Sequence, residues 1–327
     1  MIDAAMLPAL AARLRAGRGL AAKRDIARVA ARLGLSGTGA IPVGDDCAAI
    51  PDGDGFLLLA IEGFMNEFVA GDPWFAGWCG VMVNLSDVAA MGGRPIAVVD
   101  AVWADGEAGA EPVLAGLAAA AERYGVPVVG GHSNLSTDRG QLSVAVLGRA
   151  KRLLTSFAAE PGDRIVAAID HRGRYREPFS NFEAATDAPA ERLRGDLALL
   201  PEIAEAGLSS AAKDVSQGGI PGTLAMFAEA SAVGAVLDVD RVPVPDGVAP
   251  ERWLATFPSY GHLLAVKPGD VDTVVARFSA RGIVAADVGA FEPGGRVDVR
   301  AGGRRETIWD FAREPLIGCS PRPGAAA

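Results

Sequence analysis

Four short segments of this sequence place an acidic residue or a histidine beside glycine or a helix start. They are Gly44-Asp45-Asp46, Asn84-Leu85-Ser86-Asp87 ahead of Met91-Gly92-Gly93, Gly130-Gly131-His132-Ser133, and Asp214-Val215-Ser216-Gln217-Gly218-Gly219. Glycine lets backbone approach a phosphate closely, and Mg²⁺ prefers carboxylate and phosphate oxygens. A site for a metal and a triphosphate needs acidic residues from separate loops, so the set favours such a site. Ordinary turns in a glycine-rich chain are the alternative.

A fifth segment, residues 170–185, gathers arginines around a tyrosine in the sequence DHRGRYREPFSNFEAA. Arg172, Arg174 and Arg176 alternate along it, so on an extended chain they face one way. Guanidinium groups bind phosphate and carboxylate bidentately, which predicts contact with an anionic second substrate. A solvated loop is the alternative. Tyr260 is a candidate wall for a flat ring, or a core aromatic residue.

Composition bounds the class of protein. The 327 residues are 50% hydrophobic, and 31 basic against 40 acidic residues give a net charge of −9. Three separated cysteines without a CxxC pair support neither a disulfide framework nor a structural zinc site. The absence of an apolar run of about 20 residues predicts no membrane span, and we expect a cytoplasmic protein. Scattered arginines in an acidic chain argue against a nucleic-acid partner.

Hydrophobic periodicity predicts alternating helices and strands, and therefore an α/β or α+β fold. In the first half we expect helices at 1–35, 74–91 and 112–125 and strands at 56–64, 96–104, 126–131 and 142–150. The second half predicts helices at 192–207, 223–233 and 271–282 and strands at 161–170, 262–268 and 283–291. The pattern restarts near Lys151, so we expect two domains, residues 1–155 and 156–327.

The order of these motifs resembles a known superfamily. GDDCAAI, EGF, VNLSDVAAMGGRP, VVGGHS and DVSQGGIPGTLAMFAEAS follow one another over roughly residues 40–265, as in the aminoimidazole ribonucleotide (AIR) synthetase superfamily. Its members include thiamine-monophosphate kinase, selenophosphate synthetase and the hydrogenase-maturation carbamoyl dehydratase ATPase. The resemblance implies a homodimer whose N-terminal sheets close into a barrel, a flanking C-terminal α/β domain, and ATP held with Mg²⁺ by loop aspartates.

Carried over by position, the resemblance also implies site residues. The implied metal ligands are Asp45, Asp46, Glu62, Asp87 and Asp214, with Glu62 standing where relatives have aspartate. The implied nucleotide contacts are Gly44, Asp45, Asp46, Asn84, Gly130, Gly131, Asp214, Gly218 and Gly219. We expect catalytic roles for Asp45, Asp87 and His132; the alternative for His132, expected in a loop after two glycines, is a hydrogen-bonded loop residue. Carboxylates approach the roughly four negative charges of ATP only with divalent cations between them, so metal dependence follows.

Several motifs of this sequence differ from those of the named family members, so the resemblance does not identify the substrate. GGHS resembles the selenophosphate synthetase pattern, but the early reactive cysteine and its partner lysine are missing. The leading hypothesis is an ATP- and Mg²⁺-dependent enzyme, a kinase or a ligase or cyclo-ligase, that phosphorylates or activates an oxygen of a small anionic metabolite. The alternative is a nucleotide-binding regulatory or partner subunit with little activity alone.

Overall fold

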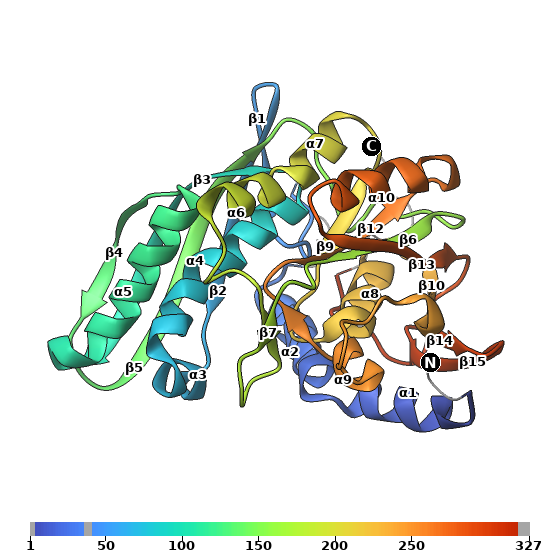
Figure 1. Ribbon diagram of the computed structural model, residues 1–327, viewed down its shortest axis with the longest axis horizontal. Helices are drawn as coiled ribbons and strands as arrows, with labels where there is room; N and C mark the ends of the chain where they lie inside the picture. The colour runs from blue at the N-terminus through green and yellow to red at the C-terminus, as the bar shows by residue number, and fades with distance from the viewer. Residues whose placement is uncertain (1–3, 36–40, 320–327) are drawn as a thin grey trace. The chain divides into compact units, whose positions relative to one another are not determined.

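The computed structural model describes residues 4–35 and 41–319. The chain forms two compact units (Figure 1), which we describe separately. The five-stranded unit contains Asp46–Leu153 and Ala185–Glu205, and the seven-stranded unit contains the described residues of Met1–Asp45, Leu154–Ala184 and Ala206–Ala327. Each unit is therefore built from segments that are separated in the sequence. The expected division into domains at residue 155 stays a prediction.

The sheet of the five-stranded unit has the order β1-β2-β5-β3-β4. Its strands are β1 (Ala48–Asp52), β2 (Gly55–Gly63), β3 (Arg94–Asp105), β4 (Val128–Asn134) and β5 (Ser136–Ala150). β3 and β4 pair in parallel, and the other neighbours are antiparallel. Its helices are α3 (Asn66–Gly71), α4 (Pro73–Ala90), α5 (Gly106–Tyr124), α6 (Ala190–Leu197) and α7 (Leu199–Glu205). Helices α4 and α5 cover one face of the sheet (Figure 1).

Local sequence accounts for α4 and α5. The Asp72 carboxylate accepts a hydrogen bond from the Phe75 amide at 3.3 Å, and Pro73 follows it, a favourable start for α4. Gly125 ends α5 in a left-handed conformation with φ of 72°. The helices cross at glycines: a Cβ on Gly116 would lie 1.9 Å from the Trp74 carbonyl oxygen. This close approach buries α4 almost all round, as its long and largely apolar sequence predicts.

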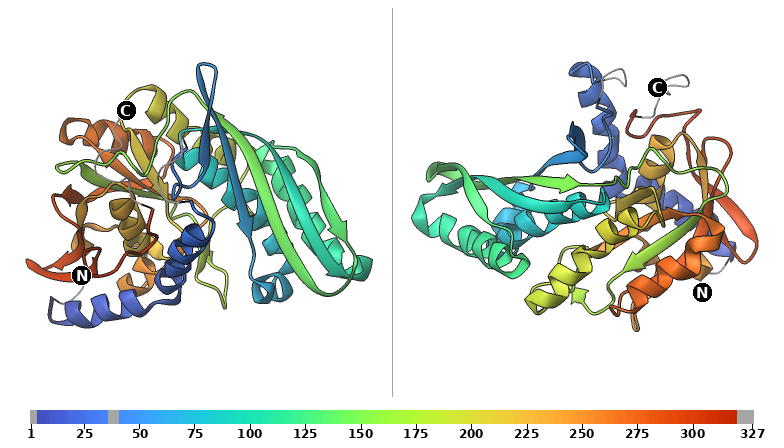
Figure 2. Two further views of the ribbon diagram at one scale, coloured as in Figure 1. Left: turned by 180° about the vertical axis from the view of Figure 1, so that it is seen from behind. Right: turned by 90° about the horizontal axis from the view of Figure 1, so that it is seen from above.

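The opposite face of this sheet carries exposed apolar side chains. Seen from behind, this unit's own described helices α4 and α5 lie on the far side of its strands (Figure 2). Leu59 and Ile61 on β2 are 48% and 68% exposed, and Leu147 on β5 and Val99 on β3 are 38% and 41% exposed. The register pairs Leu59 with Leu147 and aligns Ile61 and Val99 opposite Ala145, so all four lie on one face.

The sheet of the seven-stranded unit has the order β15-β14-β10-β13-β6-β12-β9. Its strands are β6 (Arg164–Ile169), β9 (Ala211–Asp214), β10 (Gly234–Asp238), β12 (Gly261–Val266), β13 (Val284–Glu292), β14 (Arg296–Ala301) and β15 (Arg304–Asp310). β7 (Arg174–Tyr175), β8 (Asn181–Glu183) and β11 (Phe257–Pro258) form a small separate sheet. Its helices are α1 (Leu7–Ala16), α2 (Arg18–Arg32), α8 (Gly219–Ala230), α9 (Pro250–Leu254) and α10 (Val271–Ser279).

The expected α/β fold class is confirmed, and most long elements lie where periodicity predicts them. The N-terminal helix is interrupted at Gly17 into α1 and α2, and α1 packs against β14 and β15. The sequence analysis missed β10, whose pairing partners β13 and β14 are distant in the chain, and the adjacent hairpin of β14 and β15. None of the helices within residues 4–35 and 41–319 combines the length and apolar character needed to cross a membrane.

Candidate functional site

Asp45 and Asp46 are adjacent in the chain but face different surroundings. The Asp45 carboxylate accepts hydrogen bonds from Thr155 Oγ1 at 2.6 Å, Ser156 Oγ at 2.5 Å and the Ser156 amide at 3.0 Å. Both of its oxygens are therefore engaged within the seven-stranded unit. Gly44 precedes it with φ of 117°, which favours glycine. This geometry is that of a residue that anchors the loop.

Asp46 begins the five-stranded unit and lies near Asp87 of α4. One oxygen of each carboxylate lies within 4.8 Å of the other, which is metal-ligand spacing. Asp87 is 5% exposed and sits in the last turn of α4, where the helix dipole disfavours negative charge. Two carboxylates this close repel each other unless a proton or a cation intervenes. The pair therefore has the donor chemistry of a Mg²⁺ site.

Asn84 and Glu62, two further implied site residues, belong to the same unit as this pair. Asn84 lies one turn before Asp87 and is fully buried, and its amide nitrogen donates to the Gly80 carbonyl at 2.8 Å. Its side-chain oxygen has no hydrogen-bond partner among the described residues. Glu62, near the end of β2, shares a face with buried Leu58, opposite to that of exposed Ile61. Both positions are compatible with the implied roles.

His132 lies in a strand, which corrects the expectation of a loop. Gly130, Gly131 and His132 belong to β4, the edge strand paired with β3. The strand extends through the two glycines because Gly131 stands opposite Asp100, and a Cβ there would meet Asp100 Oδ1 at 1.9 Å. The His132 ring lies 5.8 Å from that of Trp103. The segment is exposed along its whole length, and nucleotide contact by Gly130 and Gly131 stays a prediction.

Asp214 and the two glycines after it form a strand–turn–helix. Asp214 ends β9 and is 5% exposed. Gly218 caps α8 and Gly219 begins it with φ of 64°, where a Cβ would meet the Leu254 carbonyl oxygen at 2.1 Å. Free amides at a helix start attract anions. Ser216 Oγ in this turn is inaccessible to solvent and has no hydrogen-bond partner in the described part of the chain.

The arginines of 170–185 do not form one common cluster. The Arg172 guanidinium pairs with Asp170 at 2.7 and 3.1 Å and donates to the Arg281 carbonyl at 2.9 Å. Arg172 is thereby held within the protein. Arg174 begins β7 and is exposed, and Arg176 is half-buried. Tyr260 is 9% exposed and packs edge-on against His262 at 4.8 Å, the arrangement of a core aromatic.

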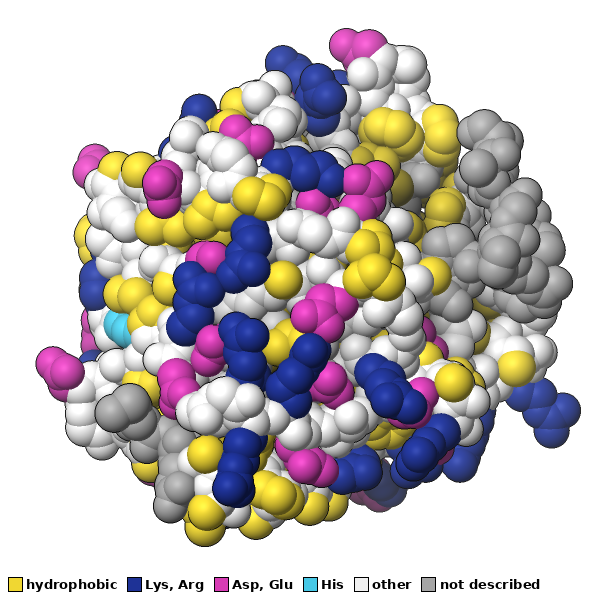
Figure 3. Space-filling model, turned by 90° about the vertical axis from the view of Figure 1, so that its right-hand side faces the viewer, with side chains coloured by type: hydrophobic (Ala, Val, Ile, Leu, Met, Phe, Trp, Pro, Cys, Tyr) yellow, Lys and Arg dark blue, Asp and Glu magenta, His cyan; other side chains and the backbone are white. Residues whose placement is uncertain are grey.

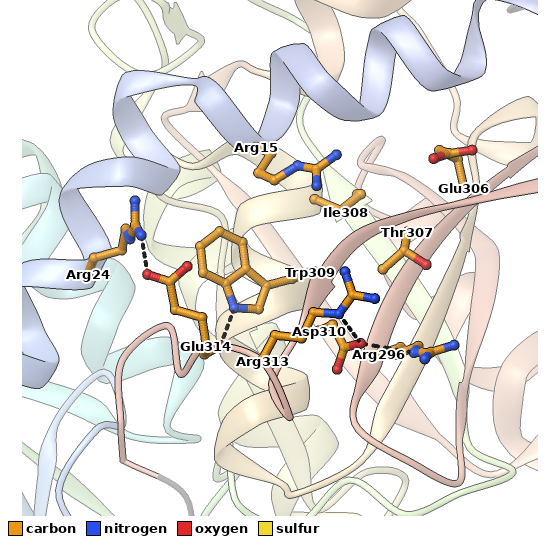
Figure 4. A pocket seen from close by; sticks show the side chains of 10 residues that line it. All are labelled: Arg15, Arg24, Arg296, Glu306, Thr307, Ile308, Trp309, Asp310, Arg313 and Glu314. Atoms are coloured by element: carbon orange, nitrogen blue, oxygen red, sulfur yellow. Dashed lines mark hydrogen bonds and ion pairs between the residues drawn. The ribbon is translucent and has the colours of Figure 1, made fainter.

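A pocket of about 380 Å³ lies in the seven-stranded unit (Figure 4). It is lined by Arg15, Arg24, Arg296, Glu306, Thr307, Ile308, Trp309, Asp310, Arg313 and Glu314. Three of its four arginines already have carboxylate partners, Glu314 for Arg24 and Asp310 for Arg296 and Arg313. Figure 3 likewise shows basic and acidic side chains interspersed on one face of the molecule. The pocket is therefore a mixed-charge network, and we assign it no ligand.

Comparison with protein families decides the relationship. The model of the AIR synthase related protein, N-terminal domain, matches residues 44–150, and that of the C-terminal domain matches residues 165–302. The chain belongs to the AIR synthase-related family. The match begins at Gly44, so helices α1 and α2 precede the family region.

Two relatives match nearly the whole chain. The Synechocystis protein sll0787 is 47% identical over 319 residues, which are 96% of this chain and 98% of that protein. MJ0640 of Methanocaldococcus jannaschii is 32% identical over 283 residues, 85% of this chain and 87% of that protein.

Solved structures show the same fold. T. maritima PurL complexed with ATP aligns with a TM-score of 0.70 and 20% identity over 88% of this chain. This chain spans only about half of PurL, 49% of its length. AaThiL complexed with AMPPCP and TMP aligns with a TM-score of 0.65 and 19% identity, over 86% of this chain and 94% of its own. These structures share the fold, and the two family matches confirm the resemblance to the superfamily.

Sequence reasoning missed Thr155, Ser156 and Asp100. Thr155 and Ser156 hold Asp45 from a point 110 residues away in the sequence, so no local pattern connects them. Asp100 had a weak signal, an acid inside the apolar strand IAVVDAVWA. Burial raises the pKa of Asp100 above its usual value.

Proposed function

We propose that this AIR synthase-related protein is a Mg²⁺-dependent enzyme that uses ATP to phosphorylate, or otherwise activate, an oxygen of a small anionic metabolite. The observation that carries the proposal is the pair of carboxylates at Asp46 and Asp87, placed within 4.8 Å of each other at the end of α4. The fold shared with PurL complexed with ATP and AaThiL complexed with AMPPCP supports a nucleotide as the ligand.

In this proposal Asp46 and Asp87 hold Mg²⁺, with Glu62 and Asp214 as further ligands. The ions offset the charge of the triphosphate, which the carboxylates alone would repel. Asp45 has a different task from the one its motif implies: it anchors the loop that ends in Asp46, because its oxygens already accept three hydrogen bonds. Asn84 supports the helix turn that carries Asp87.

The turn before α8 is the proposed phosphate contact. The hydroxyl of Ser216, which has no hydrogen-bond partner in the described part of the chain, and the backbone at Gly218 are the proposed contacts, whereas the Gly219 amide already donates to the Ser216 carbonyl at 2.8 Å. On the acceptor side, Arg174 and Arg176 remain candidates for the anionic group of the second substrate, whereas Arg172 is tied to Asp170. His132 and Gly130 present polar groups on an exposed strand. Catalysis would rest on positioning and charge neutralisation, because phosphoryl transfer asks little covalent chemistry of a protein.

Nucleotide binding and turnover test the proposal separately. We expect calorimetry to detect ATP binding that requires Mg²⁺, and ADP or phosphate release with one member of a panel of anionic metabolites. Asp87→Asn should abolish both, whereas Asp138→Asn, at an exposed residue paired with Arg139, should change neither. Equal ATP binding by wild type and Asp87→Asn would refute the assigned site. Mg²⁺-dependent binding with turnover only after a protein partner is added would favour the regulatory-subunit alternative.

The uncovered face of the five-stranded sheet is the proposed dimer interface. Leu59, Ile61, Val99 and Leu147 make it apolar over three strands, and soluble monomers rarely leave such a face open. A second copy of the chain, packing sheet against sheet, would cover it. This arrangement is the dimeric barrel that the family resemblance implies.

A further inference from the structure

Glu229 is a buried carboxylate that holds the end of the described chain. It is 5% exposed and lies in the last turn of α8, whose other residues are uncharged. Its oxygens accept hydrogen bonds from three successive amides, those of Leu316 at 3.0 Å, Ile317 at 2.6 Å and Gly318 at 3.2 Å. Burying a charge at a helix C-terminus is unfavourable, and these donors offset the cost. The Glu229 side chain thus stabilises the segment after β15 rather than its own helix.

The segment that Glu229 holds leads directly to the loop before Asp45. Cys319 is 7% exposed, and its Sγ donates to the Ile317 carbonyl at 3.3 Å. A Cβ added to Gly44 would lie 2.3 Å from the Cys319 Cβ. The Gly44 backbone therefore rests against Cys319 so closely that a shift of one must move the other.

A second anchor holds the same segment nearer to β15. Trp309 Nε1 donates to the Glu314 carbonyl at 2.9 Å, the Arg24 guanidinium pairs with the Glu314 carboxylate, and Arg24 lies 5.9 Å from the centre of the Trp309 ring (Figure 4). Within residues 309–319, Glu314 is thus held by Trp309 and by Arg24 of α2, and residues 316–318 are held by Glu229 of α8. A segment held in this way keeps Cys319 in a fixed position against Gly44.

Helix α8 also restrains Asp45 from its other side. Ser231, the residue after α8, donates through its hydroxyl to the Ser156 carbonyl at 2.6 Å. Ser156 in turn holds the Asp45 carboxylate. The end of one helix therefore reaches the Gly44 backbone by one route and the Asp45 carboxylate by another, and its start carries the Gly218 and Gly219 turn.

We infer that Glu229 is a positioning residue for the nucleotide site. By clamping the amides of 316–318 it seats Cys319 against Gly44, and this contact sets the backbone from which Asp45 and Asp46 follow. The inference rests on the proposed function for its consequence, a change in the affinity for Mg²⁺ and ATP. The clamp itself is a property of the seven-stranded unit alone.

Glu229→Gln and Glu229→Ala test the clamp. Glu229→Gln keeps the shape of the side chain but removes its charge and turns one acceptor into a donor facing an amide. We expect amide hydrogen exchange to speed up in residues 41–48 and 314–319, and the affinity for ATP with Mg²⁺ to fall about tenfold in the glutamine variant and further in the alanine variant. The control is Asp287→Asn, which breaks a partly buried ion pair with Arg164 in the same unit.

The outcomes separate the clamp from general stability and from the proposed function. Asp287→Asn should lower the melting temperature without changing exchange in 41–48 or the ATP affinity. If the Glu229 variants melt earlier but bind ATP within about twofold of wild type, Glu229 is only structural and the inference is overturned. If wild type binds no ATP, the proposed function fails, and unchanged exchange in 41–48 would then overturn the clamp independently. If the alanine variant does not fold, the glutamine variant decides.

Discussion

At the scale of single residues, the two adjacent aspartates Asp45 and Asp46 have different surroundings, although the GDD motif implies the same metal-binding role for both. Asp45 accepts three hydrogen bonds from Thr155 and Ser156, so its charge is already satisfied within the protein. Asp46 lies instead near the Asp87 carboxylate. One carboxylate therefore stabilises the loop, and the next offers its charge to a cation. Substitution should separate these two effects because stability and metal binding are measured independently.

Asp45→Asn should lower the melting temperature in the absence of ligand. An amide loses the charge that strengthens hydrogen bonds from the two hydroxyls and the Ser156 amide, a loss of roughly 1.5–3 kcal/mol. Asp87→Asn should instead remove the increase in melting temperature that Mg²⁺ and ATP produce in wild type. Differential scanning fluorimetry with and without both ligands checks the pair. A ligand-free melting temperature unchanged by Asp45→Asn would contradict the anchoring role.

Asp100 makes stability depend on pH. Burial raises its pKa, so the folded state holds the proton more tightly than the unfolded state does. The charged Asp100 carboxylate lowers the free energy of unfolding. This loss of stability is absent at low pH, where Asp100 is protonated in both states, and it appears as pH rises through the raised pKa. Asp100→Asn removes this penalty, so the variant should gain melting temperature relative to wild type at about pH 8 but not at about pH 4. An equal difference at both pH values would refute this assignment.

At the scale of elements, the position of Asp87 depends on how closely α4 and α5 pack. Gly77 on α4 and Gly116 on α5 leave room for the facing backbone: a Cβ on either would lie about 2 Å from a carbonyl oxygen of the other helix. The helices cover one face of the sheet and carry Asn84 and Asp87 on α4. Widening this crossing would therefore disturb the proposed metal site as well as the core.

Gly116→Ala should destabilise the protein by about 1–3 kcal/mol, because the added methyl group overlaps the Trp74 carbonyl oxygen, 1.9 Å away. Gly109→Ala is the matched control on α5, since its Cβ would lie 3.7 Å from the Ala104 Cβ in ordinary contact. The control should be neutral or stabilise by up to about 1 kcal/mol through helix propensity. Urea denaturation of both variants measures the difference, and equal midpoints would contradict the close crossing.

At the scale of the whole molecule, the five-stranded sheet has one face that its own helices leave uncovered. Its helices cover one face, and the other leaves Leu59, Ile61, Val99 and Leu147 exposed. Alternation along β2 explains the pattern: Leu58 and Glu62 face the helices while Leu59 and Ile61 face outward. A strand with apolar residues on both faces is typical of a sheet buried on both sides. We therefore expect a second copy of the chain to bury this face.

Ile61→Asp should convert the dimer into a monomer, because a carboxylate in the centre of an apolar interface loses its hydration. The matched control is Val29→Asp, which places the same charge at a 55% exposed position on α2 in the other unit. Light scattering during gel filtration measures the mass of each variant. A monomeric wild type would refute the interface, and a monomeric Val29→Asp would show that the change is not specific to this face.

The sequence alone determined the class of fold, the order of the main elements and the family. Periodicity and glycine are local signals, and the motifs NLSDVAAMGGRP and GDD lie intact in the chain. Tertiary structure decided which side chains have hydrogen-bond partners within the protein. Asp45 is bound by Thr155 and Ser156, Arg172 by Asp170, and Glu229 by the amides of 316–318. It also placed His132 in an edge strand, where Asp100 stands opposite Gly131. The reason is physical: a motif specifies which groups are present, whereas long-range packing decides whether a group's hydrogen-bonding capacity is used within the protein or left for a ligand.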